Sequence, residues 1–324
     1  MNAFSSRLGT VVRPCDEAGI KEAVSLIRSG LPVAVPTETV YGLAADAASN
    51  EAVARIYQAK GRPSFNPLIV HVADIEQALS IAAFSEETLK IAQLFWPGPL
   101  TMVLPLKKEA PIASIVTAGL KRVAIRMPSH PVMRALILSS RCLLAAPSAN
   151  KSGAISPTSA QHVKNSLDGR IPLILDGGLT EDGLESTIIA PENDKIHLLR
   201  YGPITIEALK KATALPIVET HKENSTSHPI EAPGQLSSHY APHQPVKLEV
   251  EVKQPDEWHI GFGKIEGDDN LSFTGDLVEA AAHLFAALHR AEASGCRQIV
   301  IAPIPDHGIG RAINDRLRRA AAPR

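Results

Sequence analysis

Short apolar runs alternate with stretches of helical periodicity along most of the chain, and this alternation constrains the fold more than any other feature. The first example is a helical pattern over 17–30, which ends at Gly30 and is followed at once by the apolar run 31–35. A closing glycine is typical of a helix C-cap, and a short apolar run between turn signals is typical of a buried strand. The alternation favours a mixed α/β domain in which helices cover a twisted sheet.

The same pattern continues to about residue 211. Further helices are predicted at 49–61, 74–82, 85–95, 131–138, 158–167 and 204–211. Further strands are predicted at 67–72, 99–106, 122–127, 142–150, 171–178, 186–191 and 195–200. Ser49 and Ser85 precede two of the helices, where a hydroxyl can accept hydrogen bonds from the first turn.

A polar stretch rich in serine, histidine and proline, 221–245, interrupts the pattern and is typical of a linker. A second α/β pattern follows it. Its predicted strands are 246–252, 257–263 and 297–305, and its predicted helices are 276–294 and 310–321. We therefore predict a larger domain over 10–215, a linker over 216–245 and a smaller α/β domain over 246–324, which is a reasonable size for a domain.

The composition is that of an ordinary globular protein, with 44% hydrophobic residues, 21% charged residues and a net charge of -1. This near-neutral net charge argues against nucleic-acid binding over the whole surface, although it allows a local basic pocket. The three cysteines, Cys15, Cys142 and Cys296, are far apart, which fits a reducing cytosol. No signal peptide and no apolar run of about 20 residues is visible, so we expect a cytoplasmic protein without a membrane partner.

Polar side chains follow the apolar run 33–35 abruptly, in the stretch "PTETVYGL". Open α/β sheets bind ligands where strands end, and Thr37, Thr39 and Tyr41 would share one face if the chain stayed extended. The alternative is that they decorate a turn at Gly42.

The stretch "KGRPSFNP" places two cations just past a predicted helix end. Lys60 and Arg62 suit a phosphate chain, and Asn66 adds a neutral donor. They could equally complement the helix C-terminus. His71 follows in a strand, where a lone histidine is more often structural than catalytic.

Arg126 lies inside an apolar strand and therefore needs an anion, because an unpaired buried charge costs several kcal/mol or more. Either a protein carboxylate or a ligand carboxylate would serve. Ser148, Asn150 and Ser156 follow a later strand and offer hydrogen bonds with little bulk, which suits a nucleotide close to the backbone. An ordinary serine-rich loop would look the same.

Six ordered blocks resemble the threonylcarbamoyl-AMP synthase family in its two-domain form: "PTETVYGL", "KGRPSFNPLIVHV", "WPGPLT", "VAIRMPSHP", "APSANKSGAISPT" and "ESTII". They cover about 10–210 as a YrdC-type catalytic domain. "APGQLSSHYAP" resembles the family's linker, although QLSS stands where basic residues are frequent, and "GIGRAINDRLRRAA" resembles the end of its accessory domain. The resemblance implies a twisted mixed sheet with flanking helices and a concave pocket, plus a smaller Rossmann-like α/β C-terminal domain.

The activity that the resemblance implies is that of a nucleotidyltransferase. It would condense L-threonine, bicarbonate or CO2, and ATP into threonylcarbamoyl-AMP and pyrophosphate, for the threonylcarbamoyladenosine modification of tRNA. Magnesium would accompany ATP, with no metal site of the protein's own. A downstream tRNA-modifying transferase complex would take the product, and contact with tRNA itself is possible.

The resemblance also implies roles for individual residues, with Lys60 and Arg62 as the catalytic cations. The implied ATP-binding residues are Lys60, Arg62, Asn66, Ser148, Asn150, Ser156, Arg200 and Tyr240. The implied threonine-binding residues are Thr39, His71, Arg126 and Ser186. Arg126 would pair with the carboxylate of threonine, and Tyr240 or His239 would close over the pocket as a lid that keeps water from a labile carbamate. Glu38 receives no role.

Two other functions compete with this interpretation. In an RNA-binding module that serves tRNA or ribosome maturation, Lys60, Arg62, Arg126 and Lys151 would bind RNA phosphates. The net charge of -1 and the 4% content of aromatic residues weigh against it. A carbamoyl transferase acting on another acceptor is the second alternative, and the absence of zinc-finger cysteines and of an acylphosphatase-like segment weighs against that one.

Overall fold

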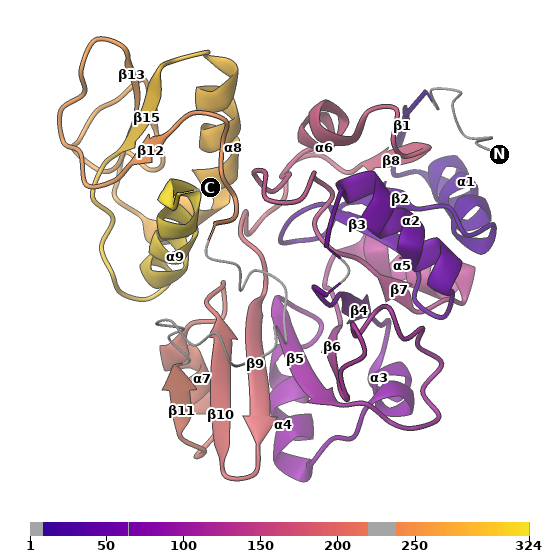
Figure 1. The fold of residues 1–324 in the computed structure, drawn as a ribbon. Helices are drawn as coiled ribbons and strands as arrows, with labels where there is room; N and C mark the ends of the chain where they lie inside the picture. The colour runs from indigo at the N-terminus through magenta and orange to yellow at the C-terminus, as the bar shows by residue number, and fades with distance from the viewer. Residues whose placement is uncertain (1–8, 64, 220–237, 324) are drawn as a thin grey trace.

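The computed structural model describes residues 9–63, 65–219 and 238–323. Within these residues the larger domain is built on one mixed sheet of eleven strands, in the order β1-β8-β2-β3-β7-β4-β6-β5-β9-β10-β11 (Figure 1). The strands are β1 (Val11–Pro14), β2 (Val33–Val35), β3 (Gly42–Asp46), β4 (Ile69–His71), β5 (Leu100–Pro105), β6 (Arg122–Arg126), β7 (Leu144–Ala145), β8 (Leu173–Asp176), β9 (Thr187–Glu192), β10 (Lys195–Arg200) and β11 (Ile217–Glu219).

The register of three neighbouring strands brings polar residues together at their ends. Strand β4 runs parallel to β6 and antiparallel to β7. His71, the last residue of β4, is therefore paired with Arg126 on one side and Leu144 on the other. Because β7 is antiparallel to β4, the loop that carries Ser148 begins at the opposite end of β4, where the N–H of Ala146 donates to the carbonyl of Ile69.

The helices of this domain are α1 (Glu17–Arg28), α2 (Asn50–Lys60), α3 (Ile75–Ile81), α4 (Glu86–Phe95), α5 (Pro131–Ser140), α6 (Ala160–Leu167) and α7 (Ile206–Ala212). The predicted caps are confirmed, because the side chains of Ser49 and Ser85 accept from the backbone N–H groups of Ala52 and Thr88. Helix α2 ends at Gly61, whose left-handed φ of 60° turns the chain toward Arg62.

The smaller domain has a parallel four-stranded sheet in the order β12-β15-β13-β14, as far as the described residues go, which confirms the Rossmann-like α/β prediction. Its elements are β12 (Val246–Lys247), β13 (Glu257–Gly261), β14 (Asp269–Asn270), α8 (Leu277–Ala293), β15 (Gln298–Ile301) and α9 (Gly310–Ala321). The predicted strand over 246–252 is wrong beyond Lys247. Glu249 has a φ of 57°, which is incompatible with an extended strand.

The two domains share one hydrophobic cluster. Val40, Ile155 and Leu184 of the larger domain pack with Tyr240 of the linker and with buried side chains of the smaller domain, such as Phe285. The cluster is continuous across the junction, so the interface resembles the inside of a domain.

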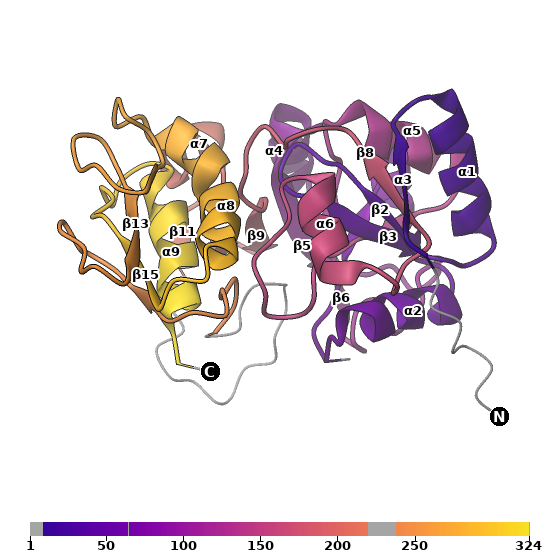
Figure 2. The ribbon, with the colours of Figure 1, turned by 90° about the horizontal axis from the view of Figure 1, so that it is seen from above.

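Close backbone contact reinforces this junction. Gly183 has a φ of 68°, and a Cβ added there would lie 2.4 Å from the carbonyl oxygen of Ala282 on α8. On the neighbouring stretch of the same helix, the ring of His289 stacks on His162 of α6 with 3.9 Å between centroids. Figure 2 shows α6 and α8 side by side.

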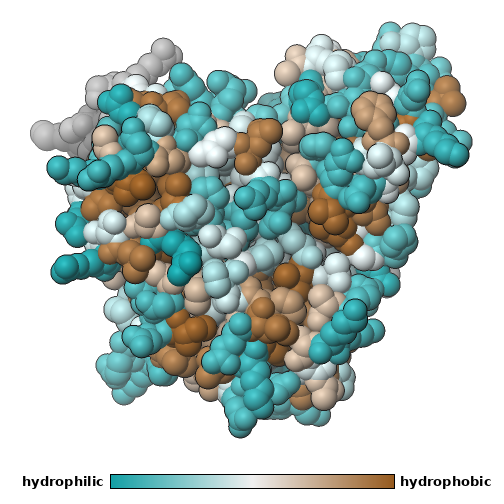
Figure 3. Space-filling model, turned by 180° about the vertical axis from the view of Figure 1, so that it is seen from behind, coloured by the Kyte–Doolittle hydropathy of each residue, from teal (hydrophilic) through white to brown (hydrophobic). Residues whose placement is uncertain are grey.

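In the described part of the chain, every helix is too short or too polar to cross a membrane. Cys15, Cys142 and Cys296 all have free thiols. On the face seen in Figure 3, polar and apolar side chains are interspersed, so no single apolar patch dominates that face.

Candidate active site

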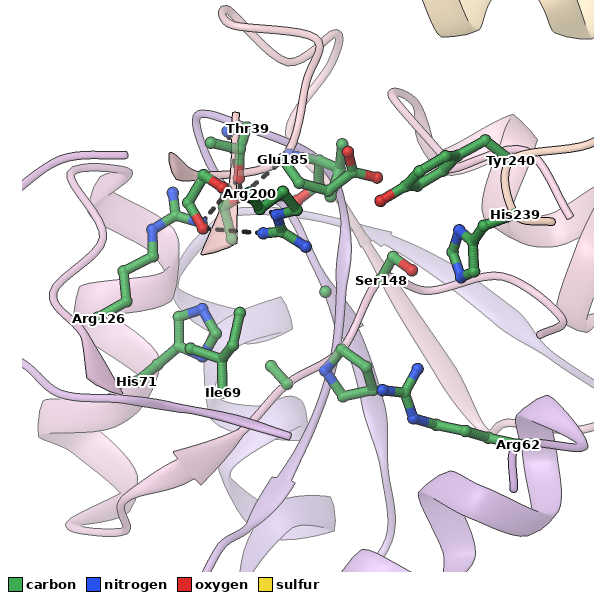
Figure 4. Close-up of a pocket in the computed structure, with 16 residues that line it drawn as sticks. Thr39, Arg62, Ile69, His71, Arg126, Ser148, Glu185, Arg200, His239 and Tyr240 are labelled. Atoms are coloured by element: carbon green, nitrogen blue, oxygen red, sulfur yellow. Dashed lines mark hydrogen bonds between the residues drawn. The ribbon is translucent and has the colours of Figure 1, made fainter. Parts of the chain in front are cut away.

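A pocket lies between strands β4 and β6, the loops that follow β2 and β7, and the linker where it returns to the larger domain. It encloses about 540 Å³ of empty space, which includes the open solvent at its mouth. It is lined by Thr37, Thr39, Val40, Gly42, Arg62, Ile69, His71, Arg126, Ala146, Pro147, Ser148, Glu185, Ser186, Arg200, His239 and Tyr240. Figure 4 shows Arg126 and His71 on one side and Arg62, His239 and Tyr240 on the other, with Ser148 between them.

Arg126 has a counter-ion within the protein. Its Nη2 lies 2.7 Å from Oε1 of Glu38, and its Nη1 donates to the hydroxyl of Thr39 at 2.9 Å. Burial raises the pKa of Glu38, but the charge of Arg126 and the N–H of Ser129 outweigh it and hold that pKa at about 2. The anion that pairs with Arg126 is therefore a carboxylate of the protein, that of Glu38. Glu38, to which the sequence assigned no role, fixes the guanidinium at the pocket wall.

Two uncharged groups lie near this pair. His71 is buried, and burial together with the charge of Arg126 lowers its pKa to about 3, so the imidazole is neutral. Its Nδ1 has no hydrogen-bond partner among the described residues. The hydroxyl of Ser186 lies 2.7 Å from that of Thr101 and accepts from Nη2 of Arg200 at 3.1 Å. The structure therefore brings together all four residues predicted to bind threonine, while their role in binding it stays a prediction.

Arg62 forms the opposite wall. Its Nε and Nη2 donate to the backbone carbonyls of Asn66 and Pro67, at 3.3 and 3.1 Å. No carboxylate among the described residues forms an ion pair with it. Burial lowers its pKa only to about 10, so it is charged at neutral pH. The amide of Asn66 is 1% exposed, and both its oxygen and its nitrogen have no partner in the described part of the chain. Asn66 itself does not line the pocket; its backbone carbonyl accepts from Arg62, which does.

Lys60 does not line the pocket. Its ammonium donates to the carbonyl oxygens of Ser148 and Asn150, at 2.5 and 2.6 Å, so it lies behind the loop that carries Ser148. Burial and the charge of Arg62 lower its pKa well below the usual value. The amide of Asn150 donates to Lys151 and Ala154, which fixes the same loop. Lys60 and Asn150 therefore shape the wall, whereas Ser148 faces the pocket.

Ser156 also lies behind the wall, where its hydroxyl donates to Oε1 of Glu185 at 2.5 Å. Glu185 itself lines the pocket, and it is a functional candidate that sequence reasoning missed. The only signal for it was its place directly before Ser186.

His239 and Tyr240 come from the linker and are both buried at the pocket. The pKa of His239 is lowered to about 3 by burial, and its Nδ1 has no partner among the described residues. Tyr41 behaves differently from Thr37 and Thr39. Its hydroxyl donates to the carbonyl of Gly178 at 2.7 Å, so it supports the loop after β8 and does not line the pocket.

In the residues that the structure describes, no group of three or more His, Cys, Asp and Glu side chains could hold a metal ion. The lining of the site thus consists mainly of cations, hydroxyls and neutral imidazoles, with Glu185 as its one carboxylate among the described residues. Such a set can bind anions and orient them, and it contains no nucleophile paired with a base.

Two family models match successive parts of this chain. A family model described as "Telomere recombination" matches residues 25–202, and one described as "Threonylcarbamoyl-AMP synthase, C-terminal domain" matches residues 204–322. The threonylcarbamoyl-AMP synthase of Bacillus subtilis (strain 168) is 40% identical, covering 94% of this chain and 93% of that protein. The protein of the same name from Pyrococcus abyssi is 39% identical, covering 94% and 95%.

A solved structure described as P. abyssi Sua5 complexed with L-threonine superposes with a TM-score of 0.86 at 38% identity, over 96% of each chain. The likeness spans both domains and the linker between them, and it agrees with the mixed sheet and the parallel C-terminal sheet described above. The chain belongs to the threonylcarbamoyl-AMP synthase family, in its two-domain form.

Proposed function

We propose that this protein is an L-threonylcarbamoyladenylate synthase, a nucleotidyltransferase that joins L-threonine, bicarbonate or CO2, and ATP. The observation that carries the proposal is the convergence of Arg62, Arg126 and Arg200 from three separate segments on one pocket. The histidines of the same pocket, His71 and His239, are uncharged. Such a pocket suits anionic ligands, and the L-threonine complex of a P. abyssi relative with the same fold supports the choice of amino acid.

The two walls of the pocket would bind different substrates. Arg126, held by Glu38 and Thr39, would pair with the carboxylate of threonine, with Ser186 and the neutral His71 beside it. Arg62, Asn66, Ser148 and Arg200 would hold the triphosphate and the adenosine, with Tyr240 closing that side. The unpaired amide of Asn66 supports this assignment. Lys60 and Asn150, together with Ser156, would act on ATP by fixing the wall that contacts it.

The chemistry proceeds in two steps. The amine of threonine forms a C–N bond to the carbon of bicarbonate with loss of water, or to CO2 with loss of a proton, and a carbamate results. A carbamate oxygen then bonds to the α-phosphorus of ATP, while the bond from that phosphorus to the bridging oxygen breaks and pyrophosphate leaves with the electron pair. The protein supplies orientation and charge neutralisation, which suffice for phosphoryl chemistry of this type.

Magnesium is part of the proposal as the companion of ATP. Glu38 and Glu185 are already paired with Arg126 and Arg316. The donors available for the ion are therefore the phosphate oxygens of the nucleotide and water, which is the set that magnesium prefers. Its chemistry would be to neutralise phosphate charge.

The proposal extends to the partners of the reaction. The product would pass to a tRNA-modifying transferase complex in the cytoplasm. Prompt transfer would limit the loss of this adenylate, because its carbamate-containing group is labile in water. A direct contact with tRNA would be tested by the dependence of binding on salt, because phosphate-backbone contacts weaken steeply as ionic strength rises.

The test is pyrophosphate release by purified full-length protein with ATP, magnesium and bicarbonate, with and without L-threonine. We expect threonine-dependent release and, by mass spectrometry, an adduct of AMP with carbamoylated threonine. Release that does not need threonine would point to another acceptor. No turnover together with salt-sensitive tRNA binding would overturn the proposal in favour of the RNA-binding module.

A further inference from the structure

Helix α9 of the smaller domain places one arginine in the seam between the two domains. Arg316 is 0% exposed. Its Nε lies 2.8 Å from Oε2 of Glu185, and its Nη2 donates to the carbonyl of Tyr201 at 2.9 Å. Its Nη1 lies 2.8 Å from Oδ2 of the adjacent Asp315. The guanidinium therefore bonds to both domains at once.

The partners of Arg316 belong to the pocket. Glu185 lines it, and the second oxygen of that carboxylate accepts from the hydroxyl of Ser156. The guanidinium carbon also lies 5.2 Å from the ring centroid of Tyr240, a cation–π distance, and Tyr240 lines the pocket too. One turn further along α9, the carbonyl of Arg319 accepts the N–H of His239. A single helix of the accessory domain thus reaches three pocket residues.

The charge balance explains what Arg316 does there. Glu185 is a buried carboxylate at the wall of a pocket proposed to hold a triphosphate, and its negative charge would repel that ligand. Burial raises the pKa of Glu185, but the charges of Arg316 and Arg200 outweigh it and lower that pKa, so the group is ionised. Arg316 supplies the neutralising charge from outside the pocket, where it takes up none of the binding space.

We propose that Arg316 is a positioning residue for ATP: it neutralises Glu185 and fixes the ring of Tyr240 at the nucleotide side of the pocket. The accessory domain is then a working part of the active site. This inference rests on the proposed function in that it names ATP as the ligand.

The experiment compares the full-length protein with Arg316→Gln, Arg316→Lys and the double variant Arg316→Gln with Glu185→Gln. Two quantities are measured: the KM for ATP and for threonine in pyrophosphate release, and the affinity for ATP in direct titration without threonine. The matched control is Arg318→Gln, which makes the same charge change at an exposed position of the same helix. Urea unfolding confirms that each variant is folded.

We expect Arg316→Gln to weaken ATP binding by about tenfold or more, because it leaves a buried carboxylate unpaired beside a polyanion. The KM for threonine should change much less. The double variant should recover most of the lost ATP affinity, because the repelling charge is gone, and Arg316→Lys should lie between the two. Lowering the pH should raise the ATP affinity of Arg316→Gln more than that of the wild type, because the unpaired Glu185 then takes up a proton.

The inference is overturned if ATP affinity in Arg316→Gln stays within about twofold of the wild type, or if the double variant recovers nothing and only kcat or stability falls. The direct titration keeps the two proposals separate. A wild-type protein without threonine-dependent turnover would count against the synthase proposal, while the ATP affinities of the variants would still decide the role of Arg316. If Arg316→Gln does not fold, the comparison of Arg316→Lys with the Arg318 control decides it.

Discussion

At the scale of single residues, the pocket is governed by charges that are already paired inside the protein. Arg126 is 4% exposed and has Glu38 as its counter-ion, so it is oriented before any substrate arrives. Arg126 lines the pocket, where a carboxylate of threonine would meet a preset guanidinium. Preorganisation of this kind raises affinity because the ligand does not pay to order the side chain.

Replacement of Arg126 by glutamine should affect threonine above all. We expect the KM for threonine to rise by about tenfold or more, and the free energy of unfolding to fall by about 3 kcal/mol because Glu38 is left unpaired. Steady-state kinetics and urea unfolding would check both. The matched control is Arg122→Gln on the same strand: Arg122 pairs with Glu192, away from the pocket. Equal effects of the two substitutions on threonine KM would contradict the assignment.

Lys60 should behave differently from Arg62. Lys60→Met removes the donor to two backbone carbonyls, and each buried group left unpaired costs about 1–3 kcal/mol, so stability and ATP binding should fall together. Arg62→Gln, on the pocket wall, should weaken ATP binding with a smaller loss of stability. Urea unfolding and ATP titration of both variants separate the cases. A Lys60→Met protein of unchanged stability that fails to bind ATP would mean that Lys60 contacts the phosphates directly.

At the scale of elements, the junction between the domains depends on close backbone approach. Gly183→Ala should lower the free energy of unfolding by more than about 2 kcal/mol. The loss combines the strain of a left-handed backbone conformation with a steric clash between the new Cβ and α8. Gly295→Ala is the control. Its φ of 71° is nearly the same, but a Cβ there would meet nothing within 4 Å, so only the strain of about 1–2 kcal/mol applies. Similar losses for both variants in urea unfolding would show that the contact with α8 is unimportant.

Periodicity and capping predicted most helices and strands of the larger domain, because those signals are local. Strand β3 was missed: it follows the polar cluster at Thr37 and Thr39 and looks like the continuation of a loop. The strand predicted over 246–252 fails because one residue, Glu249, adopts a positive φ. No signal in the local sequence indicates this positive φ, which is set by the packing of the loop.

For the site, the sequence predicted the residues better than their contacts. Thr39, His71, Arg126 and Ser186 do share one pocket. The sequence could not show that Lys60 bonds to backbone carbonyls. It could not show either that Glu38 pairs with Arg126, or Glu185 with Arg316, since the partners are far apart in the chain and meet only through the fold.

At the scale of the whole molecule, histidines packed between elements make stability depend on pH. In the native state the pKa of His162 is about 4, lowered by burial and Arg290, and that of His289 about 3, lowered by burial and His162. The unfolded chain binds these protons near pH 6.5, so the free energy of unfolding should fall as the pH drops from about 6.5 toward 4. Each such group contributes a slope of up to about 1.4 kcal/mol per pH unit.

His289→Gln tests this expectation, because glutamine can still donate to the carbonyl of Ser156. Urea unfolding at a series of pH values should give a shallower decline below pH 6.5 than in the wild type, whereas the two proteins should differ little at pH 8. A decline of equal slope in both would assign the pH dependence to other buried histidines, such as His71 and His239.

The hydrophobic cluster shared by the two domains has a consequence for handling the protein. A chain cut after residue 215 would bare Val40, Ile155 and Leu184, which now lie against the smaller domain. Exposed apolar surface of this kind promotes aggregation, so the truncated chain should be recovered from cells mainly in the insoluble fraction. Serine or threonine at those positions should restore its solubility. The truncated chain would still lack His239 and Tyr240 of the pocket and Arg316 beside it, so a soluble catalytic domain would remain an incomplete enzyme.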